Sequence, residues 1–411
     1  MKKEMKKVPA VRFKGFTGDW EQRKLGELAT FNKGAGYSKS DLKASGTQII
    51  LYGRLYTKYE TVIKQVDTFV DSRPGSVYSE GGEVIVPASG ETAEDIAIAS
   101  VVEKPGILLG GDLNIIHPIR NLDSTFLAIS ISNGEPHKEM AKRAQGKSVV
   151  HLHNDDLSQI QFKYPSIEEQ SKISKFFSNL DNLITLHQRK SDQLKKLKAY
   201  FLQNLFPDKG EKVPKIRFKG FTGDWEERKL GDICKVSSGI MGDSKLNNGT
   251  YHLTKIETIS DGFVDENRVG YLNQKPDESF RLQKGDILYS NINSISHIGK
   301  VAKYEGHSLL YHGINLLRLT PSEETDSDFL LYFLNTKGKK NWARSHANPA
   351  VNQASINKTL LETQEIMVCD MEEQKKIGAF FSIIKNHLIL HQQKITQLQA
   401  VKKFLLQNLF V

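Results

Sequence analysis

The strongest constraint on the fold is that the chain contains two copies of one unit. The segment VPAVRFKGFTGDWEQRKLG at residues 8–26 recurs almost unchanged at residues 213–231, an offset of 205. A second segment, residues 168–206, recurs at residues 372–410 with the same EEQ start and the same LQNLF end. Self-similarity over such a period indicates two structural units of one plan. We therefore expect a tandem repeat with pseudo-two-fold symmetry.

The segments between these flanks differ in sequence. Residues 27–165 and 232–370 share only short features, such as a Gly-acid-apolar strand start at Gly82 and at Gly285. Two middles with one plan and different surfaces favour two binding domains with different targets. Neutral drift after duplication is the alternative, but it does not explain why the flanks diverged so much less than the middles.

The repeated tails have the spacing of long amphipathic helices. In the first tail, Ile173, Phe177, Leu180 and Ile184 are separated by four, three and four residues, which is coiled-coil spacing. An amphipathic helix of this length must bury its apolar stripe, and the other copy is the natural partner. We therefore expect an α+β fold in which two mixed α/β domains are separated by two long antiparallel coiled-coil helices.

The repeat also places the domain boundaries. We expect the domains at residues 1–165 and 208–370, and the helices at residues 166–207 and 371–411.

Two pairs of repeated side chains invite a structural interpretation. His187 and His391 occupy matching helix positions, and we interpret them as polar residues that fix the register of the helices. Trp20 and Trp225 recur with their flanking phenylalanines. We interpret these tryptophans as packing anchors between domain and helix, with a docking surface for another protein as the alternative.

Composition favours a polyanionic partner. The 411 residues carry 57 Lys and Arg against 48 Asp and Glu, a formal net charge of +9. A basic balance of this size is typical of nucleic-acid binding, although lysines that only solvate a surface would give the same count. Two cysteines, Cys234 and Cys369, indicate a reducing cytoplasm. We expect neither a secretory signal nor a membrane span, because no long apolar run is present.

The sequence lacks the motifs of common catalytic sites. It has no GxxxxGK[ST] phosphate loop, and Asn348-Pro349-Ala350 lacks the second proline and the aromatic residue of an amino-methyltransferase motif. His137, His151 and His153 could ligate a metal, but a polar loop or strand edge is the preferred interpretation. We therefore expect a binding protein without catalytic residues, cofactor or metal of its own.

Taken together, the repeated segments resemble a known family. Arg12 to Gly26 and Arg217 to Gly231 have the pattern Arg-Phe-x-Gly-Phe, then Trp-Glu, then Leu-Gly, and each tail opens with Glu-Glu-Gln-x-x-Ile, preceded by Pro165 in the first copy. This arrangement, over essentially the whole chain, is similar to the specificity subunit of Type I restriction-modification systems.

The resemblance implies a function and a set of partners. Each middle would be a target-recognition domain that reads one half of a bipartite, asymmetric site in double-stranded DNA. The helices would space these domains and dock two methyltransferase subunits, which carry S-adenosylmethionine and methylate adenine. Two restriction subunits, which use ATP and Mg, would complete the complex. A coiled-coil scaffold that binds only proteins is the main alternative.

Chemistry and position together indicate the candidate DNA contacts. Lys and Arg suit phosphates, whereas Arg, Asn, Gln, Ser and aromatic side chains suit base edges. The candidates in the first domain are Arg54, Lys58, Tyr59, Ser89, Thr92, Lys142, Arg143, Gln145, Lys147 and Ser148, and those in the second are Lys255, Asn291, Asn293, Ser294, His297, Arg344, His346, Asn348 and Gln353. Each could equally be a solvated surface residue, but they form clusters at matching places in both copies.

Overall fold

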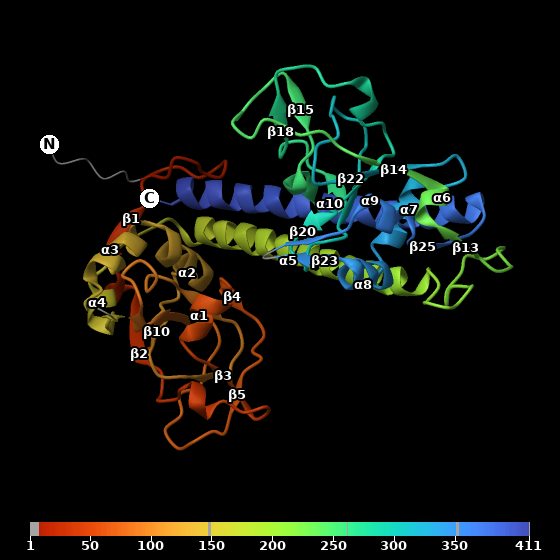
Figure 1. The fold of residues 1–411 in the computed structure, drawn as a ribbon. Helices are drawn as coiled ribbons and strands as arrows, with labels where there is room; N and C mark the ends of the chain where they lie inside the picture. Colours follow the sequence, from red (N-terminus) through yellow and green to blue (C-terminus); the bar gives the residue numbers. More distant parts are fainter. Residues whose placement is uncertain (1–7, 147–148, 261, 351–352, 411) are drawn as a thin grey trace. The chain divides into compact units, whose positions relative to one another are not determined.

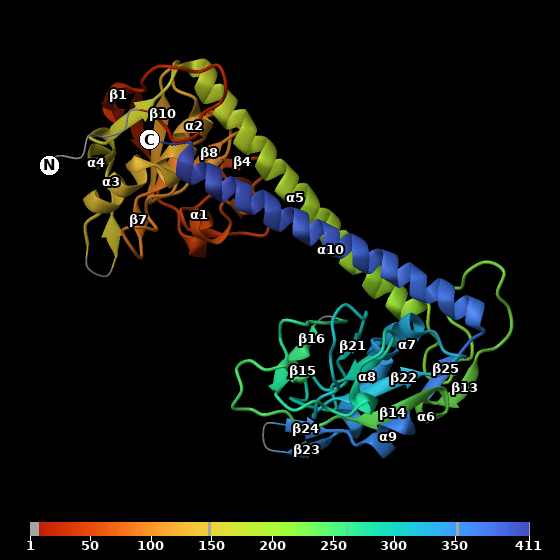
Figure 2. The same ribbon diagram turned by 90° about the horizontal axis from the view of Figure 1, so that it is seen from above.

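A computed structural model describes residues 8–146, 149–260, 262–350 and 353–410. The chain divides into two compact units (Figures 1 and 2): unit 1 comprises Met1–Gln188 and Gln393–Val411, and unit 2 comprises Arg189–Gln392. Two helices of 38 residues, α5 (Ile167–Asn204) and α10 (Met371–Asn408), each contribute to both units. Two mixed α/β domains and two long helices confirm the expected fold class. None of the described helices is long and apolar enough to cross a membrane.

Unit 1 is built on a five-stranded sheet with the order β2-β10-β6-β8-β4. Successive residues of its central strand alternate between two cores, because neighbouring side chains of a strand point to opposite faces. Val84 and Val86 join the core beneath the helices, whereas Ile85 joins a second core on the other face. The strands and helices of this layer are β2 (Ala29–Lys33), β4 (Val62–Ile63), β6 (Val84–Pro87), β8 (Ser100–Val102), β10 (Leu113–Pro118), α2 (Ser124–Asn133) and α3 (Glu135–Arg143).

Unit 2 has a six-stranded sheet with the order β14-β22-β19-β21-β17-β16. Its central strand repeats the alternation: Ile287 and Tyr289 face the helix-covered core, and Leu288 faces the other core. The two middles therefore share a plan, as expected from the repeat. The elements are β14 (Cys234–Ser238), β16 (Ile259–Ser260), β17 (Phe263–Val264), β19 (Ile287–Tyr289), β21 (Val301–Lys303), β22 (Leu317–Pro321), α7 (Ser327–Leu334) and α8 (Lys337–His346).

Smaller sheets complete each unit. In unit 1 they are β1 (Glu21–Lys24) with β12 (Gln161–Tyr164), and β5 (Phe69–Val70), β3 (Thr47–Ile50) and β9 (Leu108–Leu109); in unit 2 they are β13 (Glu226–Lys229) with β25 (Glu365–Val368), and β15 (Tyr251–Leu253) with β18 (Gly270–Leu272). Because β1 and β13 belong to the repeated heads and pair with the strands that lead into the long helices, they bring the two ends of each middle together.

The repeated Glu-Glu-Gln motif is a joint between head, helix and domain. The guanidinium of Arg12 donates two hydrogen bonds to Glu169, at 2.8 and 2.7 Å, and Arg217 donates two to Glu373, both at 2.8 Å. Each glutamate side chain is only 1% exposed. Two parallel bonds fix distance and orientation together, so each head is held rigidly on the first turn of its long helix.

The glutamine of the motif completes the joint. The Gln170 side chain accepts a hydrogen bond from the backbone N–H of Asp123 at 2.9 Å and donates to the carbonyl of Pro165 at 2.8 Å. Asp123 in turn caps α2 by accepting from the N–H of Phe126. Asp326 and Gln374 form the same bond in unit 2, also at 2.9 Å. The motif thus ties the start of each long helix to the cap of the helix that covers the sheet.

The end of each long helix packs in the unit that does not contain its own start. Phe410 lies in unit 1, with its ring centroid 5.7 Å from that of Phe126, and Phe206 lies in unit 2, 5.7 Å from Phe329. The head of each unit bonds the same helix end: Val11 N–H donates to the carbonyl of Asn408 at 3.0 Å. Each core is therefore completed by residues from the other repeat.

In unit 2 the equivalent bond runs from Ile216 N–H to the carbonyl of Asn204, at 2.9 Å.

The direction of the two long helices follows from their contacts within unit 1. Phe177 of α5 contacts Phe410 after the end of α10, whereas Asp181, one turn further along α5, bonds Lys402, which lies earlier in α10. The two helices therefore run antiparallel in this unit.

The repeated tryptophans are buried. Trp20 is 4% exposed and Trp225 is 2% exposed, and their rings contact Phe126 and Phe329 at 5.6 and 5.7 Å. A buried side chain cannot form a docking surface on the folded domain, so the structure supports the packing-anchor interpretation. The register role of His187 and His391, both half-buried, stays a prediction.

One pair of equivalent helix positions carries opposite charges. Asp181 of α5 accepts from the hydroxyl of Thr61 at 3.3 Å and bonds Lys402. Its counterpart in α10 is Lys385, which lies 3.6 Å from a carboxylate oxygen of Glu305 in unit 2. At this helix position the carboxylate of Asp181 therefore suits a hydroxyl of its own domain, and the ammonium of Lys385 suits a carboxylate of its own domain.

We predict that Phe206→Ala destabilises the chain, because its buried ring packs against the rings of Trp225, Phe333 and Phe381. A buried Phe→Ala change costs about 3–5 kcal/mol in the free energy of unfolding. Phe404→Ala is a matched control, since Phe404 is 55% exposed and its loss should change stability by less than about 0.5 kcal/mol. Urea denaturation measures the free energy of unfolding of both variants, and equal losses would contradict the proposed packing role of Phe206.

Candidate nucleic-acid interface

A short strand pair occupies the same place in both units. In unit 1, β7 (Ser89–Gly90) pairs with β11 (Val150–His151), and in unit 2, β20 (Ile292–Asn293) pairs with β24 (Gln353–Ser355), which also pairs with β23 (Asn348–Ala350). Each pair joins the loop after a central strand to the polar segment before a long helix. It brings together segments that lie about 60 positions apart, as Ser89 opposite His151 shows.

In unit 1 the strand pair is bordered by polar side chains with local partners. Ser89 Oγ lies 3.1 Å from Nδ1 of His151, and Gln145 exchanges backbone hydrogen bonds with His151 at 2.8 and 3.1 Å. The hydroxyl of Thr92 donates to Asp95 at 2.6 Å. Gln145 and Thr92 are exposed, whereas Ser89 is largely buried.

The remaining candidates of this cluster lie on and after α3. Lys142 is exposed, and Arg143 is half-buried with one N–H reaching the carbonyl of Gln159 at 3.5 Å. Lys147 and Ser148 lie outside the described residues.

Unit 2 presents amides and hydroxyls at the equivalent place. The side chain of Asn293 donates to Ser290 at 3.0 Å and accepts from the N–H of Ser294 at 2.8 Å. Ser294 Oγ lies 2.9 Å from Nδ1 of the exposed His297. Asn291, in contrast, donates to the carbonyl of Ile356 at 3.1 Å and is half-buried, so it holds the strand pair together.

The end of α8 adds a cationic edge beside this strand pair. Arg344 is exposed, and the His346 ring stacks on Trp342 with centroids 4.5 Å apart. Sequence reasoning missed Trp342, whose only signal is an aromatic residue in the lysine-rich stretch 337–346. The side chains of Asn348 and Gln353 are exposed on β23 and β24, and Lys255 is exposed before the turn at Ile256–Thr258.

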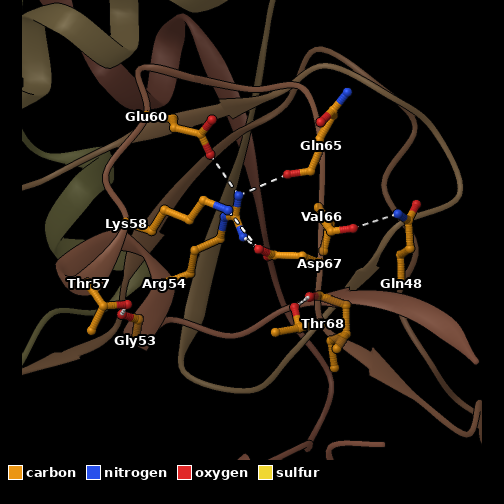
Figure 3. A network of polar contacts seen from close by, with 11 residues as sticks. Gln48, Gly53, Arg54, Thr57, Lys58, Glu60, Gln65, Val66, Asp67 and Thr68 are labelled. Carbon is orange, nitrogen blue, oxygen red and sulfur yellow. Dashed lines mark hydrogen bonds and ion pairs between the residues drawn. The ribbon is translucent and has the colours of Figure 1, made fainter. Parts of the chain in front are cut away.

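Arg54 differs from the sequence expectation. Its side chain is 8% exposed, and its guanidinium donates to Asp67 at 2.8 Å, to Glu60 at 2.7 Å and to the carbonyl of Gln65 at 2.9 Å (Figure 3). A contact with DNA phosphate requires an accessible cation, so the predicted direct role of Arg54 is corrected. Sequence spacing could not reveal these partners, because they lie on a loop that folds back over the helix.

The neighbouring candidates are more accessible. Lys58 is 53% exposed and bonds Asp67 at 2.7 Å, and the hydroxyl of Tyr59 donates to Ser132 at 3.3 Å. Both line a cleft of about 1380 Å³ in unit 1, together with Tyr52, Tyr56 and Ser89. Sequence reasoning missed Tyr52 and Tyr56, although their spacing of four residues in LYGRLYTKY places them on one side of a short helix.

The acidic strand starts are structural. Glu83 is 2% exposed and accepts from the N–H of Gly81 at 2.8 Å, and burial raises the pKa of its carboxyl group. Asp286 accepts from Thr320 at 2.6 Å. In the described part of the chain, no three His, Cys, Asp or Glu side chains are grouped as metal ligands. His137 faces the carbonyl of Ala97 at 2.7 Å, and His151 lies on a strand edge.

A comparison with protein families identifies this architecture. The model of the "Type I restriction modification DNA specificity domain" matches residues 17–196 and 222–400. The chain belongs to this family. The two matched segments coincide with the two repeats, so the family's domain occurs here twice.

Individual relatives agree. The chain is 39% identical over 208 residues to a putative type I restriction enzyme MjaX specificity subunit of Methanocaldococcus jannaschii, a match that spans about half of each protein (49% of both). It is 24% identical to the type I restriction enzyme MjaVIII specificity subunit of the same organism, over 94% of this chain and 90% of that protein.

Two solved structures share the fold. The S subunit of a Type I restriction-modification system from M. genitalium superposes with a TM-score of 0.61 at 16% identity, over 98% of this chain and 99% of that chain. A chain from a study of complex assembly and conformational transition of the type I R-M system gives 0.51 at 16% identity, over 94% and 96%.

We predict that His312 makes stability depend on pH. The ring is fully buried, with Nε2 2.9 Å from the carbonyl of Leu316, and burial lowers its pKa from 6.5 to about 4. Because the unfolded chain then binds the proton more readily, the stabilising contribution is present above pH 6.5 and is lost as pH falls towards 4. Urea unfolding between pH 7 and pH 4 measures this loss, and His312→Asn should show a weaker pH dependence. An identical dependence in the variant would refute the assignment.

Proposed function

We propose that the chain is the DNA sequence-specificity subunit of a Type I restriction-modification complex, and that each unit reads one half of a bipartite, asymmetric site. The observation that carries this proposal is the shared strand pair with different side chains in the two units. Unit 1 presents Gln145 and Thr92 there, whereas unit 2 presents Asn293, Ser294 and Gln353. One scaffold with two sets of hydrogen-bonding groups suits the reading of two base sequences.

Charge supports DNA over a purely protein partner. The net charge is +9, and exposed cations border the strand pairs, Lys142 in unit 1 and Arg344 in unit 2. Such residues neutralise phosphates and position a reader on the duplex. A protein scaffold that never contacts DNA would not need polar side chains at equivalent places in two otherwise divergent segments.

The long helices carry equivalent exposed apolar side chains. Three of them lie in each unit, at positions related by the repeat and between 43% and 60% exposed: Leu186, Val401 and Phe404 in unit 1, and Leu390, Leu197 and Tyr200 in unit 2. Exposed apolar residues that recur in both copies indicate two equivalent docking sites. Two identical sites suit a partner present in two copies, which we propose is the methyltransferase subunit.

The chemistry then resides on the partners. We propose that the methyltransferase subunits carry S-adenosylmethionine and methylate adenine, and that two restriction subunits, with ATP and Mg, join the same complex. This chain would hold no cofactor or metal and would act by binding double-stranded DNA and positioning its partners.

Methylation mapping tests the proposed function. The chain is co-expressed with its methyltransferase, and modified genomic DNA is sequenced before and after residues 27–185 are replaced by the equivalent segment of another family member. We expect a bipartite adenine-methylated motif of which only one half changes. A soluble complex that adds no methylation would favour the protein scaffold instead.

The docking proposal makes a stoichiometric prediction. Tyr200→Asp and Phe404→Asp should each remove one methyltransferase copy, and the double variant should remove both, because each change places a charge in one apolar site. Native mass spectrometry of the complex measures the copy number. Ile383→Asp is the matched control: Ile383 is 58% exposed but its counterpart is Asn179, so both copies should remain. Loss of both copies from a single variant would argue against two independent sites.

A further inference from the structure

The short helix α1 (Gly53–Thr57) of unit 1 is held in place by one buried arginine. Arg54 bonds Glu60 and Asp67 with its two terminal nitrogens, and Asp67 also bonds Lys58 (Figure 3). We call Arg54, Glu60 and Asp67 the arginine clamp. A five-residue helix is not stable by itself, so its position depends on contacts of this kind with the following loop.

The clamped helix presents a pair of tyrosines to the cleft. Tyr52 and Tyr56 are 36% and 37% exposed, and their rings meet edge to face at 6.3 Å. The hydroxyl of Tyr56 donates to the carbonyl of Ser89 at 2.9 Å, which connects the helix to the strand pair of the candidate interface. Any shift of α1 would therefore move both rings relative to that strand pair.

Among the residues that the structure describes, unit 2 has no such arrangement in the equivalent segment. After β15 the chain forms only a single 3₁₀ turn, Ile256–Thr258. This turn is held by the buried hydroxyl of Thr258, which donates to the carbonyl of Arg268 at 2.7 Å and accepts from the N–H of Lys255 at 2.9 Å. The Tyr52–Tyr56 pair and the clamp thus belong to unit 1, and any effect on recognition should be confined to one half-site.

We propose that α1 is a base-reading element of unit 1, with Tyr52 and Tyr56 in contact with DNA bases and the arginine clamp as a set of positioning residues. This inference rests on the proposed function and names further residues that contribute to the reading of one half-site. Tyrosine rings offer an apolar face for a thymine methyl group and a polar edge for hydrogen bonding. The clamp sets specificity without touching DNA.

Charge gives a test that separates the clamp from a phosphate contact. If Arg54 bound phosphate, its removal would weaken binding to all sequences and reduce the salt dependence by about one ion. Neutralising Glu60 or Asp67 would then strengthen binding, because an anion near DNA is lost. If Arg54 positions α1, removing the cation or either anion disturbs the same helix, and all three variants impair the same half-site.

The experiment uses the full chain in complex with its methyltransferase. Methylation rates and binding are measured on duplexes with the native site and with single-base changes in either half, over a series of salt concentrations. The variants are Arg54→Ala, Arg54→Lys, Glu60→Gln, Asp67→Asn, Tyr52→Ala and Tyr56→Ala. The control is Arg268→Ala, which removes a 66% exposed arginine with an ion pair to Asp265.

We expect roughly a tenfold loss of discrimination in the half-site read by unit 1 for every variant except the control, with the other half-site and the salt dependence unchanged. Lysine should not rescue Arg54, since one ammonium cannot hold both carboxylates as the guanidinium fork does. If Arg54→Ala does not fold, Glu60→Gln and Asp67→Asn still test the clamp, because each variant keeps the ion pair between Arg54 and the other carboxylate.

Two results would overturn the inference, and a third would refute the proposed function. Tighter binding by Glu60→Gln and Asp67→Asn with a reduced salt dependence for Arg54→Ala would make Arg54 a phosphate contact. Unchanged discrimination in the tyrosine variants would remove α1 from base reading. Normal methylation by all variants of a motif that also fails to respond to domain replacement would instead refute the proposed function itself.

Discussion

The architecture depends on a joint that is built twice from the same residues. In each unit an arginine of the head binds a glutamate at the start of a long helix, and the next glutamine binds the cap of the helix that covers the sheet. A phenylalanine at the end of the other long helix packs on that same covering helix. The glutamates are almost fully buried, so their charge must be matched by the bidentate arginine, and loss of either partner would leave a buried charge. The near-identity of the flanking segments follows, because both joints have one geometry.

Because of this joint, the two sequence repeats do not coincide with the two compact units of the structure. Each repeat supplies a head, a middle and a helix, but the end of its helix packs in the unit formed by the other repeat. Neither repeat alone contains a complete core. The middles are attached to the joint through the cap of α2 or α7 and through β1 or β13, which leaves their opposite faces free to diverge.

The sequence predicts correctly the features in which the spacing or recurrence of apolar residues indicates burial. The period of the tails predicted α5 and α10, and the exact recurrence of Trp20 and Trp225 predicted buried anchors. Sequence reasoning named Ser89 and Asn293 after the central strands and Gln145 and Gln353 before the long helices as candidates, but only the structure shows that the strand pairs bring the two segments together. It failed at Arg54, because a basic residue among tyrosines has the same sequence signature whether it faces solvent or two carboxylates of a returning loop. It could not show that Phe206 and Phe410 each pack in the unit that does not contain the start of their own helix, because contacts between residues so far apart in the chain leave no local pattern in the sequence. The individual DNA contacts stay predictions.

The residues that stabilise the fold and those of the candidate interface are largely different. The joints use buried, repeated residues, whereas most side chains of the candidate interface are exposed or half-buried on short strands and loops. Within unit 1 the arginine clamp links the two, since the buried Arg54 side chain holds a helix with an exposed aromatic pair.

The charge reversal between Asp181 and Lys385 bears on how new specificities can arise by recombination. A crossover before residue 166 that grafts the second middle onto the first helix would set Glu305 against Asp181, two anions, and would discard the hydroxyl of Thr61. A crossover beyond residue 181 carries the matching charge along with the middle. The inheritable cassette is therefore longer than the recognition segment itself, and it extends into the first four turns of the helix that follows.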